Sequence, residues 1–327
     1  MLENVDLYAL YEDAASIEIA GKNVYLYGLF LALGCALALI ALRILTKKRG
    51  LPSGFTALYG VIALPLSFIL ARLVYCFADN SFRSVLSVKN ILQVTGGGLA
   101  MSGALIGCIA AAALCAKIMK TPFEGVVNTV LPAVFLFILF ERIGEGFTSL
   151  GISRTLNSTV LNQTFLTRDD GFGGDWYLQT WLLEAIAAGI LFILTASFKK
   201  DAALKGGILF AASQVLFESL RYDQHLMYSF VGVQHILSML LLAVLVIYAA
   251  YRSGKPKKML WLFLLMMLAL AGALVFIEFK IDRSTINRFL LYGIYVLLLA
   301  LPAYLGIYFL NKSGGMHHGK GTGRAAE

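Results

Sequence analysis

Three ionisable side chains close an apolar run of the chain, in the stretch Phe-Ile-Leu-Phe-Glu-Arg-Ile-Gly-Glu-Gly-Phe at positions 137–147. A charge near the middle of a bilayer costs about 2.5 to 3.5 kcal/mol, so such groups usually face a polar cavity and often mark function. If the run is helical, Arg142 reaches Glu145 three residues on, and Glu141 lies one turn from Glu145. The alternative is that Arg142 sits just past the helix end and extends to the lipid headgroups.

The composition is that of a protein embedded in a membrane. Of 327 residues, 59% are hydrophobic and only 14% are charged, and the mean hydropathy is +0.78. Such values predict an all-α integral membrane protein with one transmembrane bundle rather than two soluble domains. All four cysteines fall in apolar runs, which favours free thiols over disulfides or a metal site.

Nine apolar segments are long enough to span a bilayer as helices. They cover residues 24–45, 55–77, a glycine-rich third segment that ends near 117, 123–140, 176–197, 206–220, 231–251, 260–279 and 289–310. We expect an extracytoplasmic segment at 1–23, a seven-helix core at 24–251 with an outer loop at 147–175, two additional helices at 252–311, and a flexible cytoplasmic tail at 312–327. The acidic N-terminus lacks the cationic start of a signal peptide.

The distribution of basic residues predicts the orientation. The net charge is +8, and 16 of the 27 Lys and Arg residues fall in alternate short loops and the C-terminal tail, on one side of the predicted bundle. The positive-inside rule then places the C-terminus in the cytoplasm and the N-terminus outside. Because topology accounts for the basicity, no nucleic-acid partner is needed.

Further charged side chains lie within other spans. In this topology, Arg72 and Arg221 fall toward the outer ends of their spans, and Glu184 and Glu218 lie somewhat deeper. Together with Arg142 they predict a shared polar cavity that opens outward. Guanidinium groups donate fork-wise to oxyanions, which suits the phosphate of a phospholipid.

A glycine-rich stretch precedes the third span. Gly103 and Gly107 form a GxxxG step, which predicts close helix packing. The glycines at 96–98 are not followed by the Gly-Lys-Ser/Thr of a phosphate-binding loop, so nucleotide binding is not expected.

Seven short segments occur in a consistent order between residues 17 and 248. They lie at 24–29, 71–75, 98–107, 142–145, 183–185, 218–221 and 234–238. In that order they resemble the WYGL, ARLGY, GLSFHGGLIG, GRIGNFINGE, YEA, EFFR and GQILS motifs of the bacterial prolipoprotein diacylglyceryl transferase family.

This resemblance implies an activity in the bacterial plasma membrane. Members of the family transfer the diacylglyceryl group of phosphatidylglycerol to the lipobox cysteine thiol of lipoprotein precursors and release glycerol phosphate, without a cofactor or metal. Arg142 would hold the phosphate, and the other arginines would support it. The implied catalytic residues are Glu145, Arg142 and Glu218, and the implied substrate-binding residues are Tyr27, Arg72, Ser102, Glu184, Gln214 and Arg221.

Several motif positions depart from the family pattern. Ser102 stands where the family has His, Glu145 where it has Asn, and Gln214 where it has Arg, while 148–150 replace its Asn-Gly-Glu. Glu145 could replace the missing base or could simply neutralise Arg142. These departures leave open a catalytically impaired relative that binds phospholipid or lipoprotein precursors without transfer. A transporter is less favoured, because no internal repeat is evident.

Overall fold

The computed structural model describes residues 15–19, 21–79, 87–93, 98–156, 161–169, 175–198, 200–222, 226–228, 231–283 and 286–316. Within these residues, nine helices are long and apolar enough to cross a membrane. The predicted all-α, multi-pass class is therefore confirmed. The orientation and the four-part division of the chain stay predictions. Gly96, Gly97 and most of both predicted terminal segments lie outside the described residues.

The first of two compact units comprises residues 1–198 and 220–234. Its helices are α1 (Leu26–Lys48), α2 (Phe55–Ala78), α4 (Val88–Leu92), α5 (Met101–Ile118), α6 (Phe123–Glu145) and α7 (Thr180–Ser197). Helix α6 packs against α1, α5 and α7, while α2 packs against α5 and α1. The helix that carries the charged run is therefore central to this unit.

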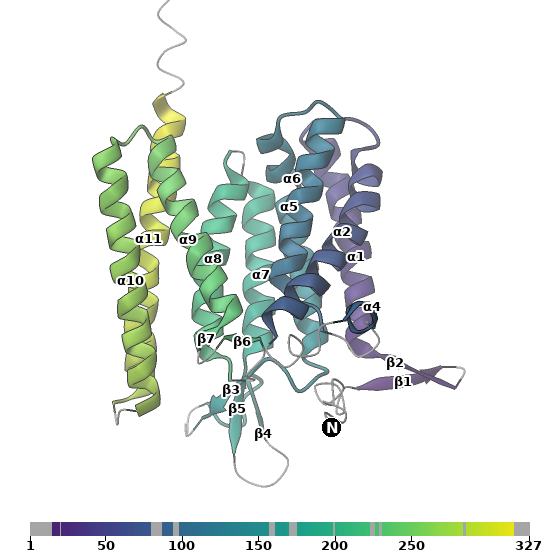
Figure 1. The fold of residues 1–327 in the computed structure, drawn as a ribbon, viewed down its shortest axis with the longest axis vertical. Coiled ribbons are helices and arrows are strands. Elements are labelled where there is room, and N and C mark those ends of the chain that lie inside the picture. Colours follow the sequence, from purple (N-terminus) through teal and green to yellow (C-terminus); the bar gives the residue numbers. More distant parts are fainter. Residues whose placement is uncertain are drawn as a thin grey trace, which may run out of the picture. The chain divides into compact units, whose positions relative to one another are not determined.

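Short strands gather at one end of these helices, together with α4 (Figure 1). An antiparallel hairpin pairs β1 (Ser16–Ile19) with β2 (Lys22–Tyr25). A three-stranded sheet has β5 (Trp176–Gln179) between β3 (Ile152–Thr155) and β4 (Thr167–Asp169). The last pair is β6 (Met227–Tyr228) with β7 (Val231–Gly232).

These strands correct several expectations from the sequence. The fifth and seventh spans, expected from 176 and 231, become helical only at Thr180 and Val233, because 176–179 form β5 and 231–232 form β7. The first span begins at Leu26 rather than at 24, because residues 22–25 belong to β2. The segment 147–175, expected as a polar loop, contributes β3 and β4 to the sheet. Strands of three or four residues are too short to show a clear alternation of apolar and polar side chains.

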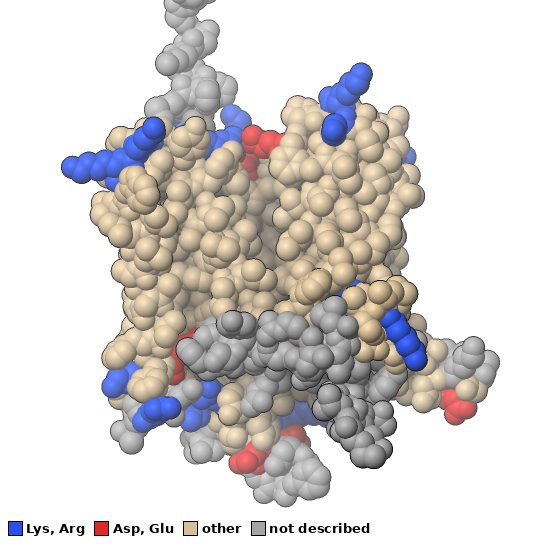
Figure 2. All heavy atoms as spheres, viewed as in Figure 1, with Lys and Arg blue, Asp and Glu red and all other residues tan. Residues whose placement is uncertain are grey.

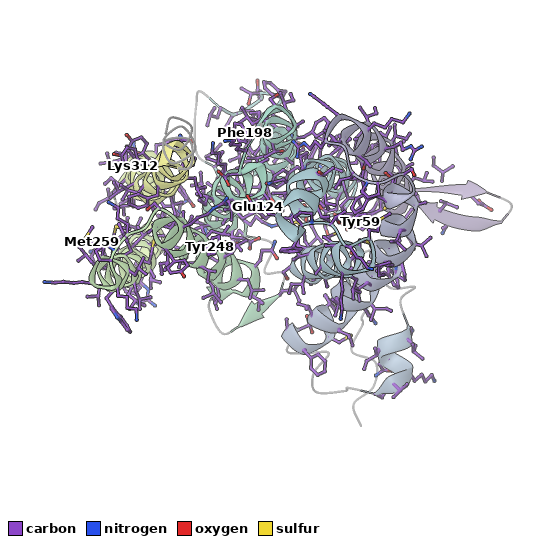
Figure 3. All side chains as sticks on the ribbon, turned by 90° about the horizontal axis from the view of Figure 1, so that it is seen from above. Tyr59, Glu124, Phe198, Tyr248, Met259 and Lys312 are labelled. Atoms are coloured by element: carbon purple, nitrogen blue, oxygen red, sulfur yellow. The ribbon has the colours of Figure 1, made fainter. Side chains whose placement is uncertain are left out.

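Close packing of α2 against α5 confirms the prediction from the GxxxG step. A side chain at Gly103 would collide with the backbone of Leu70, and one at Gly107 would collide with the backbone of Ser67. Across the same interface Tyr59, labelled in Figure 3, donates to the carbonyl oxygen of Cys108 at 3.3 Å. The glycines therefore fix where the first turn of α5 lies against α2.

A half-buried arginine ties α1, α6 and α7 together at the opposite end of the unit from the strands. Arg49, at the end of α1, donates from Nη1 to the carbonyl oxygen of Asn128 and from Nη2 to that of Thr195 at 2.9 Å. Burial lowers the pKa of the Arg49 guanidinium from its ordinary value, but an arginine stays charged in proteins.

The second unit comprises residues 199–219 and 235–327. It is built from most of α8 (Ala202–Leu220) and α9 (Val233–Arg252), with α10 (Lys257–Arg283) and α11 (Arg288–Met316). Apolar side chains from all four helices form one core. A buried tyrosine, Tyr295, lies within it and makes polar contacts to Glu278 at 3.1 Å and His235 at 3.2 Å.

Helices α8, α10 and α11 are longer than their predicted spans. The additional turn at the end of α10 carries Lys280 and Arg283. Lys280 Nζ lies 5.4 Å from the ring centroid of Phe276, and Arg283 Cζ lies 4.7 Å from that of Phe279. The aliphatic part of a long cationic side chain can pack on apolar surface while its charge stays in water. A helix can therefore continue beyond its apolar segment. On the face drawn in Figure 2, charged residues lie toward the helix ends.

We expect Gly107→Ala to lower the thermal stability of the purified protein, because the added methyl group meets the backbone of α2. Gly189→Ala is the matched control, since a methyl group there would lie 3.9 Å from Leu139, an ordinary contact. Alanine favours helix over glycine by up to about 1 kcal/mol, so Gly189→Ala should be neutral or stabilising. Equal unfolding temperatures for both variants would contradict this packing.

Candidate functional site

The charged run is the last turn of α6, which continues to Glu145. Arg142 lies inside this helix and its side chain is only 4% exposed. Its Nη1 donates to Glu145 Oε2 at 2.6 Å, which confirms the expected pairing three residues on. The alternative in which Arg142 extends past the helix end to the headgroups is wrong, because the guanidinium is buried among carboxylates.

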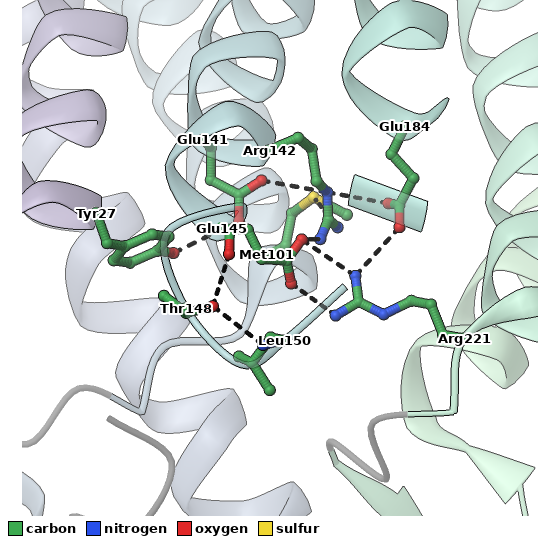
Figure 4. A network of polar contacts seen from close by, with 9 residues as sticks. All are labelled: Tyr27, Met101, Glu141, Arg142, Glu145, Thr148, Leu150, Glu184 and Arg221. Carbon is green, nitrogen blue, oxygen red and sulfur yellow. Dashed lines mark hydrogen bonds and ion pairs between the residues drawn. The ribbon is translucent and has the colours of Figure 1, made fainter. Parts of the chain in front are cut away.

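A second arginine, Arg221, also binds Glu145 (Figure 4). Arg221, directly after α8, donates from Nη2 to Glu145 Oε1 at 2.6 Å and from Nη1 to Glu145 Oε2 at 3.3 Å. Glu184 of α7 also joins both arginines: its Oε2 lies 2.9 Å from Arg142 Nε, and its Oε1 accepts from Arg221 Nη1 at 3.1 Å. Two carboxylates thus each bridge two guanidiniums.

Three further side chains border this cluster. Glu141 Oε2 lies 3.3 Å from Arg142 Nε, and Glu141 Oε1 accepts a long hydrogen bond of 3.5 Å from the Tyr27 hydroxyl. Within the described part of the chain, Glu141 Oε2 accepts no hydrogen bond. Arg142 Nη2 donates to the thioether sulfur of Met101 at 3.2 Å, and sulfur is a weak acceptor.

Carboxyl groups outnumber guanidiniums in this cluster. Three buried carboxylates face two buried guanidiniums, so full ionisation leaves one negative charge in excess. Removing one partner of a buried ion pair typically costs about 3 to 5 kcal/mol, because the other charge is left uncompensated. The cluster therefore orders α6, α7 and the start of the segment after α8.

The three-stranded sheet positions Arg221. Ser153 on β3 forms a bridge with Arg221, and the amide of Tyr222 donates to the carbonyl oxygen of Ile152 at 3.0 Å. The indole of Trp181 packs against Gly146, where a Cβ would lie 2.7 Å from the ring. Sequence patterns missed the bridge between β3 and Arg221, since only a strand assignment for 152–155 could have indicated it.

Arg72 has a different environment from the one expected. Its guanidinium donates to four backbone carbonyl oxygens: Nε to Ile91 at 2.9 Å, Nη1 to Gly98 at 2.9 Å, and Nη2 to Asn90 at 2.8 Å and Gln93 at 2.7 Å. These bonds tie α4 and the approach to α5 onto α2. The geometry favours a structural role, and substrate binding by Arg72 stays a prediction.

The other expected site residues are less directly connected. Ser102 is half-buried in the first turn of α5, beside Met101, and among the described residues it is not a hydrogen-bonding partner of the cluster. Gln214 is buried and Glu218 half-buried, both on α8 in the second unit. Their parts in the site stay predictions.

Among the residues that the structure describes, no group of three or more His, Cys, Asp or Glu side chains could hold a metal ion. The four cysteines are free thiols, as predicted. Cys76 and Cys115 are buried, while Cys35 and Cys108 are half-buried.

The fold and the site together define a multi-pass helical membrane protein with a buried guanidinium–carboxylate cluster. A family model described as prolipoprotein diacylglyceryl transferase matches residues 14–251. The chain therefore belongs to the prolipoprotein diacylglyceryl transferase family, as the seven motifs indicated, and is a multi-pass protein of the bacterial plasma membrane. Helices α10 and α11 lie outside the matched residues.

Individual relatives are distant but match over most of their length. Proteins named phosphatidylglycerol–prolipoprotein diacylglyceryl transferase are similar to this chain in three bacteria. The one from Oceanobacillus iheyensis is 23% identical over 252 residues, covering 73% of this chain and 88% of its own. Those from Listeria welshimeri and Clostridium kluyveri are 25% and 24% identical, cover 75% of this chain, and match over 92% and 99% of their own lengths.

We expect Arg72→Ala to release α4. Hydrogen bonds to charged groups contribute about 1.5 to 3 kcal/mol each, so amide exchange at residues 90–93 should accelerate at least about tenfold, because local opening becomes easier. Hydrogen exchange read by mass spectrometry measures this effect. Arg43→Ala, at an exposed arginine of α1, is the control, and unchanged exchange in Arg72→Ala would refute the structural role.

Proposed function

We propose that this protein transfers the diacylglyceryl group of phosphatidylglycerol to the cysteine thiol of a lipoprotein precursor, as its relatives' names describe. The observation that carries the proposal is the buried pair of guanidiniums, Arg142 and Arg221, at family motif positions and within reach of the same carboxylates. Guanidinium groups bind phosphate through two parallel N–H bonds.

In the proposed step, the thiolate sulfur forms a bond to the terminal glycerol carbon of the diacylglyceryl group. The bond between that carbon and the phosphate oxygen breaks, and the oxygen keeps the electron pair as glycerol phosphate leaves. Arg142 and Arg221 stabilise the charge that develops on this oxygen. Tyr27, which already donates to Glu141, lies at the border of the cluster and would contact the lipid headgroup.

A carboxylate must take the thiol proton, because a thiol has a pKa of about 8.5 and the thiolate is the nucleophile. Glu145 is the acceptor that the sequence indicated, but both of its oxygens are engaged by guanidinium donors. Glu141 has an oxygen that accepts no hydrogen bond within the described residues. We therefore place proton acceptance on Glu141, and the carboxyl later passes the proton to the departing phosphate.

A second candidate function is binding of phospholipid or lipoprotein precursor without transfer. The observation that favours it is the pairing of both guanidiniums with carboxylates of the protein itself. An anion has to compete with these partners, which weakens its binding. The same residues thus support both candidates, and only a measurement of transfer separates them.

The decisive experiment uses the full chain in nanodiscs that contain phosphatidylglycerol, with a synthetic lipobox peptide as acceptor. We expect the peptide to gain the mass of one diacylglyceryl group at its cysteine. A peptide with serine in place of that cysteine is the control and should gain nothing. Retained lipid without any mass gain would reject transfer in favour of the second candidate.

Arg142→Lys tests the role of the guanidinium in this reaction. Lysine keeps the positive charge but loses the planar fork. We expect the transfer rate to fall about 100-fold or more, as when one donor to a developing oxyanion is removed. Arg43→Lys, on an exposed part of α1, should leave the rate unchanged. Full activity in Arg142→Lys would eliminate fork-wise binding of phosphate by this residue.

A further inference from the structure

Glu145 lies where the fork-like donors of two arginines converge. Its two oxygens receive three N–H contacts, from Arg142 Nη1 at 2.6 Å and from Arg221 Nη2 and Nη1 at 2.6 and 3.3 Å. The contact with Arg221 is two-pronged, the arrangement in which a guanidinium binds either a carboxylate or a phosphate. A carboxylate of the protein thus fills a position built for an oxyanion.

We propose that the Glu145 carboxylate stands in for the substrate's phosphate between the two guanidiniums, and so sets how strongly the site binds an anionic headgroup. The inference rests on the proposed function and deepens it. To bind both arginines, the phosphate has to displace this carboxylate, and Glu145 is thereby a determinant of headgroup affinity.

Glu184 also bridges the two arginines but occupies a different position. Its Oε2 lies 2.9 Å from Arg142 Nε, whereas Glu145 binds a terminal nitrogen of that arginine. Its Oε1 accepts from Arg221 Nη1 at 3.1 Å. Its side chain is 0% exposed, within the first turns of α7. Glu184 therefore pairs with Arg142 through Nε, while Glu145 accepts from a terminal nitrogen of Arg142 and from both terminal nitrogens of Arg221.

The position of Glu145 in the chain suits a displaceable group. It is the last residue of α6 and is followed by a turn, in which the amide and hydroxyl of Thr148 bond to the Glu145 carbonyl oxygen at 2.9 and 2.7 Å. These bonds hold the backbone, whereas the carboxylate is held by the two arginines. Because three carboxyl groups already face two guanidiniums, exchange of a carboxylate is also favoured over addition of a further anion.

Binding measurements on the full chain in detergent test this proposal without a thiol acceptor. The probes are dihexanoyl phosphatidylglycerol, free glycerol 1-phosphate and, as a ligand without phosphate, dioctanoylglycerol. For Glu145→Gln we expect the dissociation constant of the phosphatidylglycerol probe to fall at least about tenfold, since close charge pairs couple strongly in buried sites. Affinity for dioctanoylglycerol should not change.

Glu184→Gln is the matched control, because it removes the same charge from the same two arginines. We expect a smaller gain than in Glu145→Gln. An equal gain would attribute the effect to net charge and overturn the proposal, as would an unchanged affinity in Glu145→Gln. A gain confined to free glycerol 1-phosphate would also overturn it, because the displaced ligand would then not be a lipid.

Folding of the variants is checked by size-exclusion chromatography and thermal unfolding. Glu145→Asn is the second variant, and its shorter amide side chain would lie farther from the two guanidiniums. It should show the same gain in affinity for the phosphatidylglycerol probe. If neither Glu145 variant folds, Glu145 is a structural partner and the proposal fails. A gain in affinity without any transfer would support this inference while rejecting the proposed reaction, so the two ideas fail separately.

Discussion

The structure of the first unit depends on neutralising buried charge. Arg142 and Arg221 are withdrawn from water at the end of the spanning helices, and Glu141, Glu145 and Glu184 compensate them. Because an uncompensated buried charge costs several kcal/mol, each of α6, α7 and the segment after α8 is constrained by the others. The same requirement explains why the site is assembled from distant parts of the chain around a central α6.

Neutralisation of buried charge and the proposed binding of a phosphate place opposing demands on these arginines. A phosphate binds best to guanidiniums whose donors are free, whereas a stable fold requires partners for them in the absence of substrate. Asparagine at the position of Glu145, as in the family motif, would leave more of the donors available. This chain has a carboxylate there instead, and that carboxylate pairs with both arginines in the structure.

Much of the architecture was predictable because long apolar segments carry a strong signal. Composition and hydropathy predicted the nine spans, and the spacing of Arg142 and Glu145 predicted their ion pair. The partners of Arg72 were not predictable, since backbone carbonyl oxygens have no sequence signature. The bridge between Ser153 and Arg221 was missed for a related reason: a strand of four residues has no clear period, and its partner lies far along the chain.

Helices α1, α6 and α7 are joined near both ends. Arg49 connects all three at one end, while Tyr27 reaches Glu141, and Glu184 reaches Arg142, near the other. A helix that is bonded to its neighbours near both ends resists both tilting and rotation about its axis. These three helices are therefore held at a fixed tilt and rotation relative to one another, so a change of conformation in this unit has to come from segments attached to them rather than from bending of the helices.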